Sequence, residues 1–282
     1  MMNNFILKMH SVMKTQANKN RRLSKPLIQL GWIILLLFLW EFSVKVFKIS
    51  PLLFPPVESV LQTLWTSFIR GDLGYQAFYS FGFILIGLTV SAVLAILLIW
   101  IAFRWPVAGS FIDTVTAIAH PLPGLALLPL LIIWFGAGSG TVLAIVIHSA
   151  LWPILLSLLS GFNAVPQIYI DAARNLSMRK SDIILSVMFK SALGYFISGL
   201  KIGWARAWRA LISAEMVFGA IGAKGGIGWY ILKQRTFMST AGLFAGIIVV
   251  VVLGILVEDL FFNWLEKVTI RRWGMSAAND KK

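Results

Sequence analysis

A run of 57 residues, from 114 to 170, contains no Asp, Glu, Lys or Arg. Its second half begins Thr141-Val-Leu-Ala-Ile-Val-Ile-His148-Ser-Ala-Leu-Trp-Pro-Ile-Leu-Leu-Ser-Leu-Leu-Ser160. A membrane-spanning helix needs about 20 mostly apolar residues, so this run is far too long for one crossing. The glycine-rich stretch 136–140 lies near its middle and favours a break between two helices. The run therefore predicts one membrane span before residue 136 and another after residue 140.

Four further segments have the length and composition of membrane spans. Across the whole chain, 59% of residues are hydrophobic and only 13% are charged, about half the charged fraction of a soluble protein. We therefore expect an all-α membrane protein with six transmembrane helices. The four further segments are 26–47, 81–103, 191–218 and 236–257.

The composition excludes several kinds of site. The sequence contains no Cys, which rules out disulfides, thiolate metal sites and cysteine nucleophiles. Its three His residues are far apart and have no carboxylate at metal-ligand spacing, so we expect no metal site. No Gly-x-x-x-x-Gly-Lys-Ser/Thr motif occurs, and the chain therefore has no P-loop for ATP phosphates. We expect no catalytic residue and no cofactor bound by this chain.

The basic residues predict the orientation, because Lys and Arg are enriched in cytoplasmic loops. With the N-terminus in the cytoplasm and six crossings, 16 of them fall on the cytoplasmic side and six on the outer side. We therefore predict a basic cytoplasmic tail over 1–25, a transmembrane domain over 26–268 and a cytoplasmic tail over 269–282. The net charge of +14 then reflects topology, and we expect no nucleic acid partner. The six outer residues are Lys45, Lys48, Arg70, Lys224, Lys233 and Arg235.

Two segments between the spans are long enough to fold. In the outer segment, Val57, Leu61 and Leu64 follow helical spacing after a proline pair, which predicts a short amphipathic helix. The cytoplasmic segment 163–190 is roughly five times longer than a connection requires, and Pro166 is placed to begin a helix there. We interpret it as a projecting elbow of two short helices that docks on another protein. A solvated linker is the alternative.

At this elbow the sequence resembles the membrane permease subunits of bacterial ABC importers, which carry a cytoplasmic Glu-Ala-Ala motif. Asp171-Ala172-Ala173 fills the first three positions of the motif, and Ser177 stands where the family has Gly. Lys190 and Gly194 stand where the closest branch usually has proline. Further stretches, in the same order along the chain, are similar to the nitrate/sulfonate/taurine branch of that family. These stretches are 54–61, 121–136, 199–216, 225–229 and 271–274, so that the resemblance covers roughly 30–275.

The resemblance implies a six-span permease in a bacterial inner membrane. It also implies that two permeases work as a pair, which we expect to be a homodimer, with a related second permease in place of one copy as the alternative. An ABC ATPase subunit would bind each elbow, and a substrate-binding protein would deliver a small nitrate-, sulfonate- or taurine-like solute from outside. ATP and Mg would bind to the ATPase, and the elbow would hold the coupling helix. The implied ATPase-coupling residues are Asp171, Ala172, Ala173, Arg174 and Ser177.

Charged residues and prolines within the spans are candidates for the translocation path. A charge that faces lipid at mid-bilayer costs several kcal/mol, so such side chains should face a bundle interior or an aqueous path. Prolines at 121, 123 and 129 interrupt the third span, and such breaks are tolerated where backbone lines a cavity or is buried in protein. Structural ion pairing is the alternative for the charges, and we expect His120 and His148 to be hydrogen-bonded core residues. The residues predicted to line the path or its gate are Arg206, Arg209, Glu215, Trp208 and Pro123.

Two other functions compete with an ATP-driven importer. A secondary transporter or channel driven by an ion gradient needs acids within the membrane, and only Glu215 and Asp113 qualify. A membrane-embedded enzyme needs a catalytic constellation within its spans, and the spans contain no His–acid or acid–acid pair at helical spacing. The ATP-driven importer is therefore the main prediction.

Overall fold

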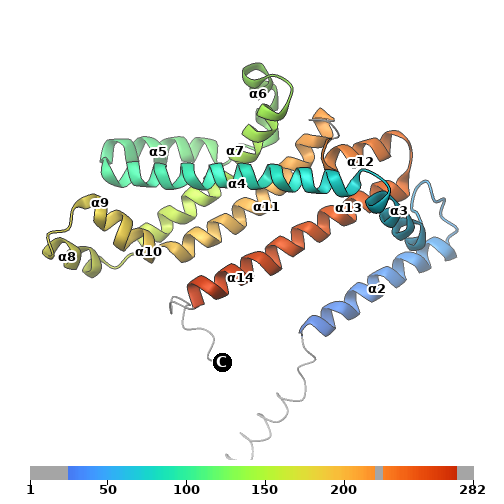
Figure 1. Ribbon diagram of the computed structural model, residues 1–282, viewed down its shortest axis with the longest axis horizontal. Helices are drawn as coiled ribbons and strands as arrows, with labels where there is room; N and C mark the ends of the chain where they lie inside the picture. The colour runs from blue at the N-terminus through green and yellow to red at the C-terminus, as the bar shows by residue number, and fades with distance from the viewer. Residues whose placement is uncertain (1–24, 220–224, 272–282) are drawn as a thin grey trace, which may run out of the picture. The chain divides into compact units, whose positions relative to one another are not determined.

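The computed structural model describes residues 25–219 and 225–271, and every regular element in these ranges is helical (Figure 1). The expected tails lie outside these ranges, apart from Lys25 and residues 269–271. The α-helices are α2 (Lys25–Val46), α3 (Val57–Ile69), α4 (Leu73–Arg104), α5 (Pro106–Ala119), α6 (Leu128–Phe135), α7 (Ser139–Asn163), α8 (Gln167–Asn175), α9 (Lys180–Asp182), α10 (Phe189–Ser191), α11 (Leu193–Phe218), α12 (Ile227–Thr236), α13 (Thr240–Ile255) and α14 (Asn263–Glu266). A 3₁₀ helix, η1, covers Gly124–Leu127, and the π-helical segments are η2 (Ile183–Met188), η3 (Leu256–Phe262) and η4 (Lys267–Arg271).

Four helical segments are long and apolar enough to cross a membrane by themselves, and the number reaches six if each of two bent pairs is one span. The sequence predicted a single span immediately before Gly136. Instead, α5 and the η1–α6 segment are bent by 94° around residues 120–123. Pro121 and Pro123 have no backbone N–H and cannot continue the helix, which accounts for the break. The four single spans are Leu27–Val46, Leu73–Arg104, Ser139–Asn163 and Thr240–Thr269.

The second bent pair lies at the foot of the expected fifth span. Helix Lys180–Ser191 and helix Leu193–Phe218 are bent by 67° at Ala192. This bend forms without a proline, since Lys190 and Gly194 stand at the two positions where the resemblance led us to expect one. Ala192 has φ −85° and ψ 0°, and its side chain is fully buried, so packing holds the bend.

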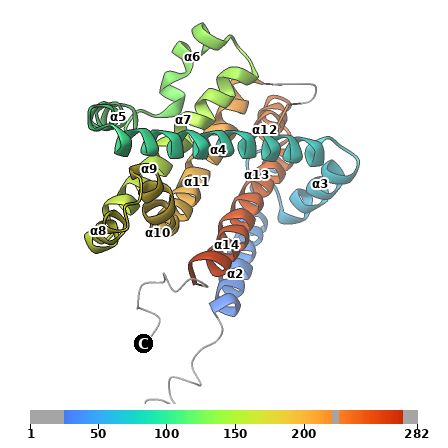
Figure 2. The same cartoon turned by 60° about the vertical axis from the view of Figure 1, so that its left-hand side comes forward.

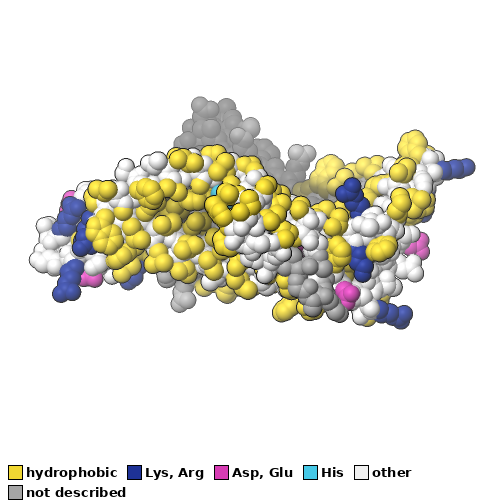
Figure 3. Space-filling view, turned by 90° about the horizontal axis from the view of Figure 1, so that it is seen from above, with side chains coloured by type: hydrophobic (Ala, Val, Ile, Leu, Met, Phe, Trp, Pro, Cys, Tyr) yellow, Lys and Arg dark blue, Asp and Glu magenta, His cyan; other side chains and the backbone are white. Residues whose placement is uncertain are grey.

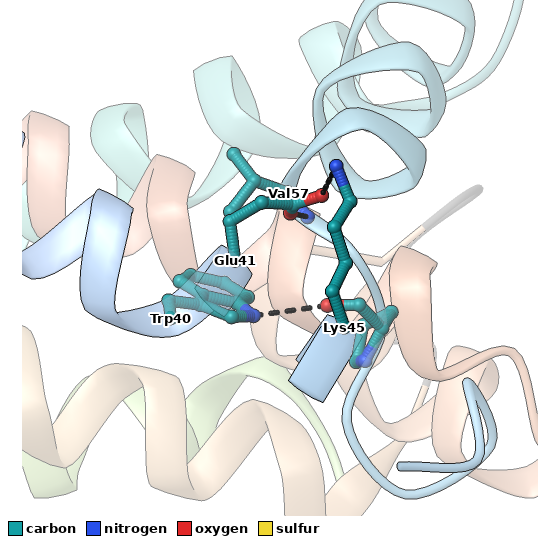
Figure 4. Close-up of polar contacts among 5 residues, drawn as sticks. Trp40, Glu41, Lys45 and Val57 are labelled. Atoms are coloured by element: carbon teal, nitrogen blue, oxygen red, sulfur yellow. Dashed lines mark hydrogen bonds and ion pairs between the residues drawn. The ribbon is translucent and has the colours of Figure 1, made fainter. Parts of the chain in front are cut away.

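The chain divides into two compact units, Met1–Gln62 and Thr63–Lys282. In the first unit, the side chains of α2 are mostly apolar, most of them do not pack within that unit, and the helix has the length and composition of a membrane span. Near the end of α2, the Glu41 carboxylate accepts a hydrogen bond of 2.9 Å from the Val57 N–H at the start of α3 (Figure 4). Lys45 forms an ion pair of 2.9 Å with the same carboxylate, and the Trp40 indole donates to the Pro55 carbonyl.

In the second unit, α7 and α11 form the centre of the core and run side by side, and α4 packs on both (Figures 1 and 2). Glycines permit close approach of α11 to α7 and of α13 to α12. A Cβ added at Gly199 would meet Ser157 and Ile154 of α7, and one at Gly246 would meet Ile231 and Tyr230 of α12.

Candidate functional site

A pocket of about 340 Å³ opens where the broken segment 120–125 faces the middle of α7 and of α11. Three of the five predicted path residues line it, namely Arg206 and Arg209 from α11 and Pro123 from the break. Ser213 continues the arginine stripe one turn further along α11. The break in the third span therefore borders a cavity, which is one of the two settings in which such breaks are tolerated.

Each pocket arginine is held by one hydrogen bond. Arg206 Nη1 lies 3.0 Å from His120 Nε2, and Arg209 Nε donates to the Ala205 carbonyl at 2.9 Å. Among the described residues, neither guanidinium has a carboxylate within 4 Å, so neither forms an ion pair in this part of the chain. A guanidinium has five N–H donors, and most of those on both arginines therefore stay available in the pocket.

A second histidine and a tryptophan form the α7 wall of the pocket. Trp152 Nε1 donates to His148 Nδ1 at 3.1 Å, and His148 Nε2 lies 3.1 Å from the Leu122 carbonyl. An indole nitrogen is only a donor, so His148 Nδ1 accepts and its Nε2–H donates to Leu122. We assign the neutral tautomer on this basis. The expectation of a hydrogen-bonded histidine is confirmed, but both histidines line a pocket and are only partly buried.

Glu215 and Trp208, the other two predicted path residues, lie elsewhere. The Glu215 side chain is 1% exposed, and its carboxylate accepts the Ser80 hydroxyl at 2.7 Å and the Gly228 N–H at 2.9 Å. Trp208 is 5% exposed, and its indole donates to the Val250 carbonyl of α13 at 3.2 Å. Both residues lie outside the pocket and pack α11 against its neighbours, so their predicted role in the path or its gate stays a prediction.

The glycine-rich stretch 225–229 fits closely around the Glu215 carboxylate. Ser80 also accepts the Ile227 N–H at 2.9 Å, so two polar side chains satisfy the first two N–H groups of α12. A side chain at Gly226 would collide with Glu215 and Ser80, and one at Gly228 would collide with the Ile212 carbonyl. We call the set Ser80, Glu215, Gly226, Ile227 and Gly228 the buried clasp. It ties α4, α11 and α12 together.

The elbow contains the helix that the sequence predicted. α8 begins directly after Pro166, and its apolar residues divide between two faces. Ala173 is 4% exposed and packs, with Ile170, on η2 and the body of the unit. Ile168 and Leu176 are exposed by 71% and 77%, with Ala172 exposed between them at helical spacing. Ala172 therefore lies on the outer stripe of α8, whereas Ala173 faces inward and does not lie on the surface open to a partner.

The polar residues of α8 pair with one another. Asp171 accepts from Gln167 Nε2 at 2.9 Å and forms an ion pair of 3.3 Å with Arg174. Both side chains are more than half exposed, so this pair contributes little to stability. Asp171 and Arg174 are consequently accessible on the elbow, where α8, α9 and α10 form one end of the second unit (Figure 1).

Ser177 ends α8 in a left-handed conformation, with φ 58°. Its N–H donates to the Arg174 carbonyl at 2.8 Å, and the Met178 N–H donates to the Ala173 carbonyl at 3.2 Å. These two bonds are those of a Schellman motif, which usually has Gly at this position. Ser177 therefore fills a glycine position at a conformational cost, and it does not cap the next helix, whose N-cap is Arg179.

Sequence reasoning missed the pocket roles of His120, His148 and Trp152. A signal was present, because His120 immediately precedes the proline break, and His148 and Trp152 are four residues apart on one helical face. That these two faces meet depends on the 94° bend, which no local pattern specifies.

The chain matches known proteins over most of its length. Residues 78–271 match the family model described as "Binding-protein-dependent transport system inner membrane component". The chain is 30% identical to the taurine transport system permease protein TauC of Escherichia coli, over 82% of this chain and 84% of that one. It is 27% identical to the nitrate import permease protein NrtB of Synechocystis, over 70% of each chain. It is 28% identical to the bicarbonate transport system permease protein CmpB of Synechococcus elongatus, over 58% and 57%. The chain therefore belongs to the family of binding-protein-dependent transport system inner membrane components.

Proposed function

We propose that this permease forms the translocation path for a small anion in an ATP-driven importer and receives its driving force through α8. It is a transport component and not an enzyme, and ATP hydrolysis belongs to a separate subunit. The relatives are named for the transport of taurine, nitrate and bicarbonate, and each of these solutes carries an anionic group. The observation that carries the proposal is that residues 78–271, which match the family model, contain both the arginine pocket and the elbow.

The outer stripe of α8, formed by Ile168, Ala172 and Leu176, supports an ATPase docking role. These side chains are exposed although the first and last are large and apolar. Exposed apolar residues rimmed by charges are typical of protein-interaction sites, and Asp171 and Arg174 provide such a rim. Lys and Arg side chains gather at this end in the space-filling view (Figure 3), while hydrophobic side chains cover the middle of the face in view.

An ion-gradient mechanism is less well supported by the same residues. Glu215 has hydrogen bonds from Ser80 and Gly228 and lies outside the pocket. Among the residues that line the pocket there is no Asp or Glu. A coupling acid would have to face the solute path, so we favour ATP-driven transport.

The substitution Ala172→Glu tests the docking role. It adds volume and charge to the exposed stripe without entering the packed core, so we expect normal abundance in the membrane. Copurification of the ATPase and substrate-stimulated ATP hydrolysis should be lost, because overpacking and an unpaired charge both oppose docking. Ser186→Glu is the matched control, since Ser186 is exposed at the same end of the unit but lies outside α8. Normal transport by the Ala172→Glu permease would contradict the proposal.

The substitution Ala173→Glu, by contrast, places a charge in the contact between α8 and η2. We expect lower abundance as well as lost transport, because Ala173 is buried in its own unit. Comparing membrane levels of the two variants by immunoblot separates a docking defect from a folding defect.

The proposed assembly has both termini in the cytoplasm, two permease copies and two ATPases, with ATP and Mg on the latter. The cysteine-free sequence allows orientation to be tested with single cysteines at the exposed positions Arg179 and Arg235. An impermeant maleimide should label only Arg235→Cys in intact cells and both variants after permeabilisation.

The mass of the complex purified with its ATPase should correspond to two copies of each chain, and a single permease copy with transport activity would exclude the homodimer.

A further inference from the structure

We propose that the arginine pocket is itself a binding site for a small soluble oxyanion, such as a sulfonate, carboxylate or nitrate group, on its way through the permease. This inference rests on the proposed function, since it assigns the solute class to a particular place in the path. The volume of about 340 Å³ accommodates a solute of this size with some water. The site lies within the membrane-spanning helices and is separate from the external binding protein that the family requires.

The charge of the pocket is the first argument. Arg206 and Arg209 are the charged residues among those that line it, and no carboxylate lies within 4 Å of either in the described part of the chain. Two cations held without an acidic partner within spanning helices are costly unless an anion or water accompanies them. A passing anion would reduce this cost.

The hydrogen bonds within the pocket are the second argument. His120 accepts from Arg206, and His148 accepts from Trp152, so both histidines act as neutral rings and add no positive charge. Their role is to orient: His120 holds one guanidinium from the proline break, and His148 binds the Leu122 carbonyl of the same break. The remaining N–H groups of the arginines present the forked geometry that matches planar or tetrahedral oxyanions.

The absence of cysteine from the sequence makes the electrostatic prediction measurable. A thiol introduced by Ser213→Cys lies in the pocket lining one helical turn beyond Arg209, and Leu125→Cys provides a second reporter from the broken segment. We would compare the reaction rates of an anionic reagent, 2-sulfonatoethyl methanethiosulfonate, and a cationic one, 2-(trimethylammonium)ethyl methanethiosulfonate. The full-length permease in phosphatidylcholine nanodiscs is the sample.

Relative to a free thiol, we expect the pocket thiols to favour the anionic reagent by about tenfold, because nearby unit charges act strongly outside bulk water. Arg206→Gln or Arg209→Gln should remove much of this preference, while Arg209→Lys should keep most of it. Arg235→Gln, outside the pocket, is the matched control and should change nothing. Methanesulfonate should slow the anionic reagent, whereas dimethyl sulfone, its neutral analogue, should not. An exposed thiol from Ser198→Cys reports any general effect of salt.

Three outcomes would overturn the proposal. One is that both reporter thiols show the same ratio of anionic to cationic reaction rates as a free thiol. A carboxylate from a second copy of the chain that neutralises the arginines would produce this result. Another is a preference that survives replacement of both arginines by glutamine. The third is protection only when phosphatidylglycerol is added to the nanodiscs, with none by methanesulfonate, which would assign the site to a lipid headgroup. Import by the complete complex is measured separately, so an anion-selective pocket without ATP-driven import would refute the proposed function and leave this site intact.

Discussion

Two glutamates in this protein each bind the first turn of a short helix that follows a membrane-spanning one, but in very different surroundings. Glu41 of α2 accepts the Val57 N–H at the start of α3, and Glu215 of α11 accepts the Gly228 N–H at the start of α12. A carboxylate is favourable at a helix N-terminus because the unpaired N–H groups and the helix dipole are positive there. The same local rule therefore places both helices.

The difference between the two lies in burial. Glu41 is partly exposed and is neutralised by Lys45, whose side chain is 73% exposed. Glu215 is 1% exposed and, among the described residues, has no cation within 4 Å, so hydrogen bonds and close-fitting glycines replace a counter-charge. A carboxylate without a cation can remain buried only when its surroundings supply donors. The comparison teaches that Glu215 has a structural role that its charge alone does not reveal.

The largest expected difference in stability is between the variants in which each glutamate is truncated to alanine. Glu215→Ala leaves the Gly228 N–H and the Ser80 hydroxyl without their acceptor in a buried place, which should cost about 3 kcal/mol or more. Glu41→Ala should cost much less, because water can reach the Val57 N–H. The measurement is the midpoint of unfolding during titration with SDS in mixed micelles. Equal losses for the two variants would show that burial does not distinguish the glutamates.

A smaller loss of unfolding free energy is expected when the close packing around the Glu215 carboxylate is disturbed. Gly228→Ala drives a methyl group into the Ile212 carbonyl, a backbone atom that cannot turn aside, and overpacking of this kind costs about 1–3 kcal/mol. Gly82→Ala is the matched control, since nothing lies within 4 Å of the added Cβ in α4. The same unfolding titration should show a loss for Gly228→Ala and none for Gly82→Ala.

The Ser80 hydroxyl of the buried clasp should contribute less to the free energy of unfolding than the packing around Gly228. Ser80→Ala removes both a donor to Glu215 and an acceptor for the Ile227 N–H, and we expect a loss of about 1–2 kcal/mol. Ser198→Ala removes an exposed hydroxyl that bonds only within its own helix and should be neutral. If these two variants unfold at the same SDS concentration, Ser80 does not hold α12.

The smallest expected change in stability is at the C-terminal end of α8, where a serine takes the position that usually has glycine. At the end of α8, Ser177 adopts φ 58°, and Ser177→Gly should stabilise the elbow by up to about 1 kcal/mol, since Gly adopts this conformation without steric cost. Hydrogen exchange of α8 amides should slow in the variant, while exchange in α12 stays unchanged. Faster exchange in α8 would show that the Ser177 hydroxyl makes a contribution beyond the backbone.

Several features of the site followed from sequence because they depend on local pattern. Pro166 predicted the start of α8, and the proline cluster predicted a break, which borders the pocket. Arg206, Arg209 and Ser213 follow helical spacing along α11, and all three line the pocket. Glu215 was grouped with the arginines because all are charges in one span. The structure separates them, because Glu215 faces α4 and α12 while the arginines face the broken segment.

The sequence by itself determined that the protein is helical and membrane-spanning, since apolar runs of sufficient length can satisfy their backbone in lipid only as helices. It also determined the family, through motifs that keep their order along the chain. Only the tertiary structure decided that α5 and α6 meet at 94°, that Ala173 faces inward while Ala172 faces outward, and that α12 folds onto Glu215. These outcomes depend on which faces of distant helices come together. Contacts between segments more than a hundred residues apart, such as Ser80 and Glu215, leave no periodic signal in a single chain.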